Sequence, residues 1–134
     1  MTVAVESVTT SALSLAMDAV SLRQEVLATN IANVDMPDYV PLSVNFEEQL
    51  GAARRALQTQ GRLDPASLAN VTPKVQVASD AKTGMPAFPG LSTGVTLDLE
   101  VARLSQNAGK YAMLAKLLSK NFGILSSAVS DGKR

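Results

Sequence analysis

The residues that most often perform catalysis are missing from this chain. It contains no histidine and no cysteine, which excludes the commonest general base, the commonest thiol nucleophile, disulfide bonds and the usual structural zinc sites. Carboxylates remain at Glu47, Glu48, Asp98 and Glu100, but their spacing fits neither a calcium loop nor a hydrolytic pair. We interpret these four carboxylates as solvated surface charges, and we expect no enzymatic activity, no metal and no cofactor.

The charge pattern argues against nucleic acid and lipid as partners. Lys and Arg number 12, as do Asp and Glu, and no stretch gathers enough positive charge to neutralise a row of phosphates. Arg54 and Arg55 are interpreted as a solvated helix face. The most apolar stretch, residues 112–129, carries Lys116 and Lys120 one turn apart. That stretch is typical of an amphipathic helix, and we expect neither a membrane span nor direct lipid binding.

The beginning of the chain does not resemble a secretory signal. No positive residue precedes Arg23, and Glu6, Ser7, Thr9 and Thr10 interrupt the apolar residues. We expect no cleaved signal peptide.

Two asparagines in the segment A-T-N-I-A-N-V-D-M-P-D-Y, residues 28–39, are the most informative polar residues. Asn30 and Asn33 fall on one face at the end of a predicted helix, where the last four carbonyls have no partner in the helix. They can cap their own helix, or they can bond to the backbone of another chain and fix the register of an assembly. Because asparagine is a common helix terminator, the spacing alone favours capping.

Long helices at the two ends of the chain must position these residues. Apolar residues at alternating steps of four and three form a heptad seam near the C-terminus, consisting of Leu97, Val101, Leu104, Ala108, Tyr111, Ala115, Leu118, Phe122, Leu125 and Val129. A seam of this length needs a partner helix. A row near the N-terminus has the same rhythm and is a candidate partner: Val8, Ala12, Leu15, Ala19, Leu22 and Val26. The aromatic residues Tyr111 and Phe122 lie on the C-terminal seam and are predicted to fill a helix interface.

The first helix is predicted over residues 11–33, which contain no Gly or Pro. Pro37 should end it near Asn33 to Asp35. A second apolar row on the same helix widens its buried face and consists of Leu13, Ala16, Val20, Leu27 and Ile31. We therefore expect this helix to be contacted on more than one side.

Between the long helices, apolar residues at helical spacing predict a short helix at about residues 46–59. Residues 61–94 contain four prolines and four glycines, which favours an irregular segment. It could hold at most one short β element, an edge strand with Val71, Val75 and Val77, because Pro73 excludes a central strand. The predicted fold is all-α, with the terminal helices packed as an antiparallel coiled-coil-like pair. Three parts result: an N-terminal assembly helix (1–35), a connecting region (36–94) and a C-terminal assembly helix (95–131).

Residues 28–39 resemble the N-terminal signature of the bacterial flagellar rod, hook and hook-associated axial proteins, A-N-N-I-A-N-x-x-T-P-G-Y. The matching residues are Ala28, Asn30, Ile31, Ala32, Asn33, Pro37 and Tyr39, whereas Thr29, Met36 and Asp38 depart from the signature. The short length, the Val44–Leu50 run and the C-terminal string Glu100, Asn107, Tyr111, Leu117, Leu118, Phe122, Leu125 and Ala128 are similar to proximal rod proteins of that family.

This resemblance implies a structural protein of the flagellar basal-body rod whose terminal helices pack with those of other copies into a hollow tube. It implies an assembly interface at Asn30, Ile31, Asn33, Pro37, Tyr39, Leu97, Val101, Leu104, Tyr111, Leu118, Phe122 and Leu125. The implied partners are the chain itself, other proximal rod proteins of the FlgC and FlgF types, the adaptor to the membrane ring, the ring itself and the flagellar type III export apparatus. The implied location is the rod within the periplasm.

A different class of protein also fits the seams. A soluble helical adaptor or chaperone-like module could use the heptad face to bind a client helix. That alternative gives no reason for the asparagine signature or for the proline-rich connecting segment.

Overall fold

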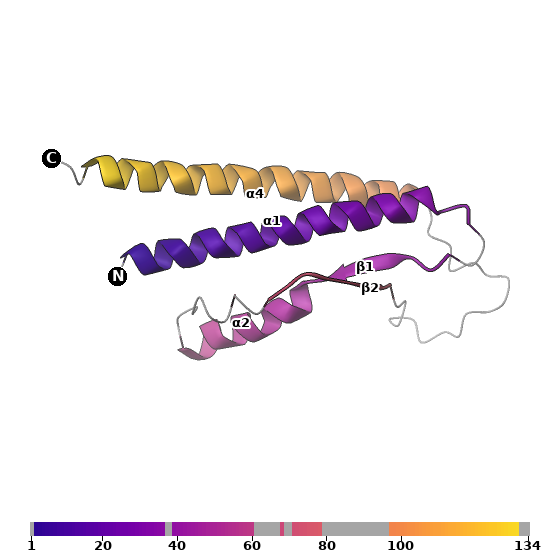
Figure 1. Ribbon diagram of the computed structural model, residues 1–134, viewed down its shortest axis with the longest axis horizontal. Coiled ribbons are helices and arrows are strands. Elements are labelled where there is room, and N and C mark those ends of the chain that lie inside the picture. The colour runs from indigo at the N-terminus through magenta and orange to yellow at the C-terminus, as the bar shows by residue number, and fades with distance from the viewer. Residues whose placement is uncertain (1, 37–38, 61–67, 69–70, 79–96, 132–134) are drawn as a thin grey trace.

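Two long antiparallel helices dominate the computed structural model, which describes residues 2–36, 39–60, 68, 71–78 and 97–131. Helix α1 spans Thr2–Ala32 and helix α4 spans Leu97–Asp131. They run side by side in opposite directions, so the start of α1 and the end of α4 lie at the same end of the molecule (Figure 1). The predicted antiparallel pair of terminal helices is confirmed.

The ends of these helices have local causes. Helix α1 ends at Ala32, where a turn follows and the amide of Asn33 donates back to the carbonyl of Thr29 at 3.2 Å. Its start at Thr2 lies nine residues before the predicted start at Ser11, so that boundary is wrong. Helix α4 begins with Asp98 and Glu100 in its first turn, where negative charge interacts favourably with the helix dipole.

The connecting region contains a short helix and a small sheet. Helix α2 spans Glu47–Gln60, which confirms the predicted short helix within one residue at each end. Strands β1 (Leu42–Asn45) and β2 (Lys74–Val77) pair antiparallel, with Leu42 opposite Val77 and Asn45 opposite Lys74. Strand β2 contains the predicted Val75 and Val77, whereas the predicted Val71 lies before it, on the other side of Pro73. Strand β1 is not among the predicted elements.

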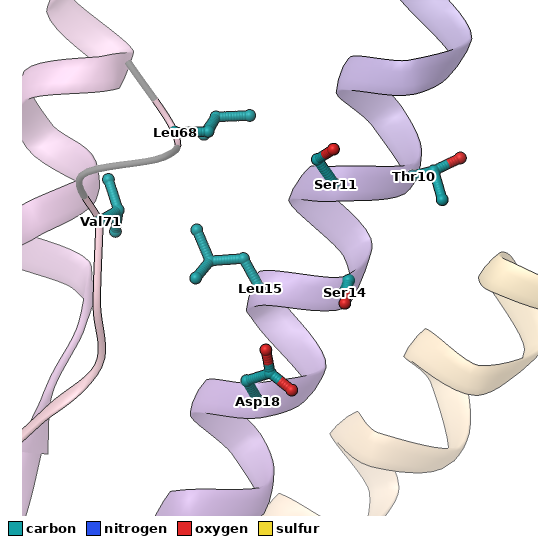
Figure 2. A pocket seen from close by; sticks show the side chains of 7 residues that line it. All are labelled: Thr10, Ser11, Ser14, Leu15, Asp18, Leu68 and Val71. Atoms are coloured by element: carbon teal, nitrogen blue, oxygen red, sulfur yellow. The ribbon is translucent and has the colours of Figure 1, made fainter. Parts of the chain in front are cut away.

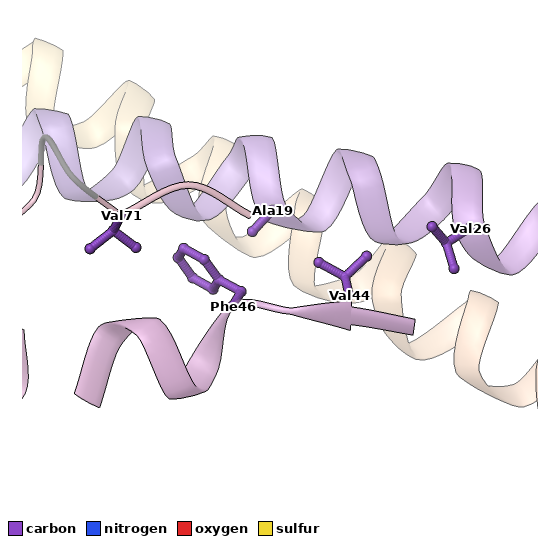
Figure 3. Close-up of a cluster of buried hydrophobic side chains, with 5 residues drawn as sticks. All are labelled: Ala19, Val26, Val44, Phe46 and Val71. Atoms are coloured by element: carbon purple, nitrogen blue, oxygen red, sulfur yellow. The ribbon is translucent and has the colours of Figure 1, made fainter. Parts of the chain in front are cut away.

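The apolar core lies between α1 and this connecting region. Five buried side chains form it, and Figure 3 shows them converging from α1, β1 and the segments next to α2 and β2: Ala19, Val26, Val44, Phe46 and Val71. Leu15 and Leu22 of α1 pack against the same cluster. Burial of a side chain such as Phe46 contributes about 1.5–3 kcal/mol.

The N-terminal heptad row therefore has a different partner from the one predicted. Leu15, Ala19, Leu22 and Val26 pack on the sheet and Phe46, not on the seam of α4. The second row of α1 supplies two further buried residues outside this cluster, Val20 and Leu27. Because α1 lies between α4 and the sheet (Figure 1), the expectation of contacts on more than one side is confirmed.

Candidate assembly site

Asn30 is the centre of a polar junction that joins three parts of the chain. Its side-chain Oδ1 accepts hydrogen bonds from the amide of Leu42 at 2.9 Å and from the hydroxyl of Tyr39 at 3.0 Å. Its Nδ2 donates to the carbonyl of Leu42 at 2.9 Å and to Oε2 of Glu100 at 3.1 Å. Asn30 is 2% exposed, and these bonds use its full hydrogen-bonding capacity.

The side-chain amide of Asn30 makes the hydrogen bonds to Leu42 that the backbone of a neighbouring strand would make. It receives the N–H of Leu42 and donates to the C=O of the same residue, which is the exchange that a hydrogen-bonded pair makes in an antiparallel sheet. The end of α1 is thereby fixed against the start of β1. The neighbouring signature residue Tyr39 closes the turn through its hydroxyl.

Glu100 brings α4 into the same junction. Its side chain is 2% exposed; Oε2 accepts from Asn30, and Oε1 lies 2.6 Å from Nη1 of Arg103. The interpretation of Glu100 as a solvated surface charge is therefore wrong. Its position in the first turn of α4 adds the favourable field of the helix N-terminus to these two bonds.

Asn33 behaves as the simpler prediction expected. Its Nδ2 donates to the carbonyl of Thr29 at 2.7 Å, so it caps its own helix. In the single chain all the side-chain bonds of Asn30 are made within that chain. That either asparagine bonds to another chain in an assembly stays a prediction. Ile31 is half-buried, and Pro37 lies outside the described residues.

Two further polar contacts join α4 to α1 beyond the junction. The Nδ2 of Asn107 donates to the carbonyl of Val20 at 2.9 Å and to Oε1 of Gln24 at 2.7 Å. Nearer the C-terminus, the hydroxyl of Thr10 donates to Oδ1 of Asn121 at 3.0 Å. Glu100, Asn107 and Asn121 are separated from one another by multiples of seven residues, so they form one row at heptad spacing on α4. Polar side chains in such a row fix the register of two paired helices.

This polar row changes the predicted role of the apolar seam on α4. Of the predicted seam residues, Leu104, Leu118 and Leu125 are half-buried beside the polar row. Six others are exposed, among them Leu97 at 48%, Val101 at 45%, Tyr111 at 45% and Phe122 at 53%. Among the described residues of one chain, nothing covers Tyr111 and Phe122 as a helix interface would.

An ion pair ties the sheet side of the molecule to α1. Arg23 of α1 reaches both carboxylate oxygens of Glu47 at 2.7 and 2.8 Å. Partial burial acts to raise the pKa of Glu47, but the hydrogen bond from Arg23, backbone amides at the start of α2 and the charge of Arg23 together hold that pKa below its usual value. Arg54 and Arg55 are exposed, as predicted.

The described residues form a groove beside α1 and no metal-binding group. A groove of about 520 Å³ lies between α1 and the side chains of Leu68 and Val71 (Figure 2). Among the described residues that line it, Asp18 is the one ionisable side chain. No group of His, Cys, Asp or Glu among the described residues could hold a metal ion. Within the same part of the chain, no helix is long and apolar enough to cross a membrane.

Comparison with known proteins gives one informative match. No protein-family model matches the chain. It is 25% identical over 124 residues to the flagellar basal body rod protein FlgB of Bacillus subtilis (strain 168), a match that covers 90% of this chain and 92% of that protein. The resemblance to flagellar axial proteins that rests on residues 28–39 is therefore confirmed, and the chain is FlgB-like over nearly its whole length.

Proposed function

We propose that this chain is a structural subunit of the bacterial flagellar rod and that it assembles through its two terminal helices. Its similarity to a flagellar basal body rod protein over nearly the whole chain supports this assignment. The absence of histidine and cysteine agrees with a structural role, since the usual catalytic side chains are missing.

The exposed half of the α4 seam is the observation that carries this proposal. Leu97, Val101, Tyr111 and Phe122 keep heptad spacing on one side of α4 and are about half exposed. Apolar side chains in such a row are typical of a surface that a second helix covers. A subunit that leaves this row open gains stability by packing beside others, as rod formation requires.

The partners that we propose are those that a subunit of the rod would contact. They are copies of this chain, other proximal rod proteins of the FlgC and FlgF types, the adaptor that joins the rod to the membrane ring, and the export apparatus that delivers the subunits. Torque would pass through the rod along the paired helices. The Asn30 junction supports this role, because it fixes α4 against α1 and so makes the pair one stiff unit.

Deletion of the gene tests the proposal. Electron microscopy of purified basal bodies should show rods that are missing or truncated in the deletion strain, and a plasmid copy should restore them. The alternative, a helical adaptor that binds a client helix through the same exposed row, predicts normal rods in that strain. Normal rods would therefore overturn the proposed function.

A further inference from the structure

A second exposed row on α4 differs in chemistry from the apolar seam. Its members again follow steps of four and three and combine apolar with basic side chains: Leu99, Arg103, Gln106, Lys110, Met113, Leu117, Lys120 and Ile124. All of them are exposed, and the exposed fractions reach 64% at Met113 and 55% at Ile124. Between residues 101 and 130, α4 carries four basic residues and no acidic one. We call this surface the basic row.

Helix α1 presents a row of the opposite character. Ser14, Asp18, Ser21, Glu25 and Ala28 follow the same steps of four and three and are all exposed. Each side chain is either small or acidic. We call this surface the acidic row.

The acidic row faces neither of the chain's own partners. Leu15, Ala19 and Val26 direct one side of α1 toward the sheet, and Val20 and Gln24 mark the side that α4 contacts. At about 100° per residue, the acidic row occupies the remaining third of the helix circumference. The groove in Figure 2 opens along this side and has Ser14 and Asp18 in its lining.

We propose that the basic row of one copy docks on the acidic row of the next copy. The two rows are complementary in charge, and large apolar side chains on one meet small side chains on the other, as knobs fit holes between paired helices. Within one chain the rows cannot meet, because both lie away from the contact between α1 and α4. The choice of a second copy of this chain as the partner rests on the proposed rod function.

The contacts within one chain predict the register of this docking. Asn107 lies level with Val20 and Gln24, and Thr10 lies level with Asn121. A second copy at the same height and in the same orientation therefore brings Asp18 beside Lys110. In that register Ser14 lies beside Met113 and Leu117, whose side chains can enter the groove at Ser14.

Such a contact propagates from copy to copy. It joins α4 of one subunit to α1 of the next, so it uses two different surfaces and leaves one of each free at the ends of every assembly. Contacts of this kind generate rings or open helical filaments, whereas a self-complementary contact stops at a dimer. The proposed docking thus accounts for a tube built from side-by-side subunits.

Cysteine cross-linking in basal bodies tests the contact directly, because the chain has no cysteine of its own. A Ser14→Cys, Met113→Cys double variant should form disulfide-linked dimers and longer ladders on oxidation, while each single variant should not form ladders. A Ser14→Cys, Tyr111→Cys double variant is the matched control, since Tyr111 lies on the apolar seam. Ladders from the control pair, or none from the Ser14 and Met113 pair, would overturn the proposed docking.

Charge reversal provides the second arm. Lys110→Glu and Asp18→Lys should each lower the number of rods per cell at least about tenfold, because opposite charges become like charges in every contact. Combining the two substitutions should restore rods, and Lys116→Glu, off the basic row, should change little. Normal rods in either single variant would refute the docking and leave the rod function intact, whereas normal rods after gene deletion would refute the rod function itself.

Discussion

The side-chain amide of Asn30 donates a hydrogen bond of 3.1 Å to the buried carboxylate of Glu100, which lies 70 residues further along the chain. Asn30 stands at the end of α1 and Glu100 in the first turn of α4, so this bond joins the two long helices at one end of the molecule. The asparagine signature therefore stabilises the fold of the subunit itself. Its position also sets where α4 begins to pack along α1.

Asn30→Ala should destabilise the isolated chain by about 2–3 kcal/mol, because it leaves the carboxylate of Glu100 and the backbone groups of Leu42 without their buried partner. Urea denaturation followed by circular dichroism measures this loss. Asn33→Ala is the matched control and should cost no more than about 1 kcal/mol, since it removes one bond at an exposed helix end. Equal effects of the two substitutions would contradict the junction.

Asn107→Leu, unlike Asn30→Ala, should not lower the stability of the isolated chain. The Oδ1 of Asn107 is buried and has no hydrogen-bond partner among the described residues, so the native side chain carries a desolvation cost. A leucine of similar size should leave stability unchanged or raise it by about 1 kcal/mol, at the expense of a polar contact that fixes register. The same urea titration checks this, and a loss of about 2 kcal/mol or more would show that the two bonds of Asn107 outweigh that cost.

The ion pair between Arg23 and Glu47 predicts a dependence on pH. The pKa of Glu47 in the folded chain lies below its reference value of 4.5, so its contribution to stability is present above that pH and disappears as the pH falls through the lower, folded value. The Glu47 side chain is 66% exposed, which limits this contribution to less than about 1 kcal/mol.

A comparison with Glu47→Gln isolates this effect from the other carboxylates. The native chain should be the more stable of the two at about pH 6, and the difference should be smaller at about pH 2, because the Glu47 carboxylate takes up a proton as the pH falls through its lowered pKa. Urea midpoints of both proteins at the two pH values give the result. A stability difference that stays constant between these values would rule out the ion pair as its source.

The parts of the fold that local sequence controls were predictable. A stretch without Gly or Pro indicated α1, the heptad seam indicated α4, and helical spacing after Asn45 indicated α2. The start of α1 could not be predicted, because Thr9 and Thr10 have low helix propensity. That region is supported by α4, through the hydrogen bond between Thr10 and Asn121. Strand β1 was missed because its pairing depends on β2 and on the side chain of Asn30.

The candidate site shows a similar division. The importance of Asn30 and Tyr39 could be inferred from their resemblance to a known signature, but their bonding partners could not, since Glu100 is distant in sequence. The side of α4 that contacts α1 could not be predicted either. Two rows on α4 contain more apolar residues than the row of Glu100, Asn107 and Asn121 and are the more obvious candidates for that contact. That polar row faces α1 because Asn30, Val20, Gln24 and Thr10 supply its partners.

Two positions on α4 separate folding from assembly. Leu118 is half-buried and lies at heptad spacing beside Asn107 and Asn121, which bond to α1, whereas Phe122 is 53% exposed in the single chain. Leu118→Asp should therefore destabilise the isolated chain by several kcal/mol, since it places a charge in the contact between the helices. Phe122→Asp should leave the stability of the isolated chain within about 0.5 kcal/mol of the native value.

The most direct test of the account is the number of complete rods in cells that carry Phe122→Asp, counted by electron microscopy of purified basal bodies, with the exported subunit measured in parallel. In an assembled rod, the same substitution buries an unpaired charge in every subunit contact. We predict that the folded variant is still exported and that rods are absent. Normal rods in this strain would contradict assembly through the exposed face of α4.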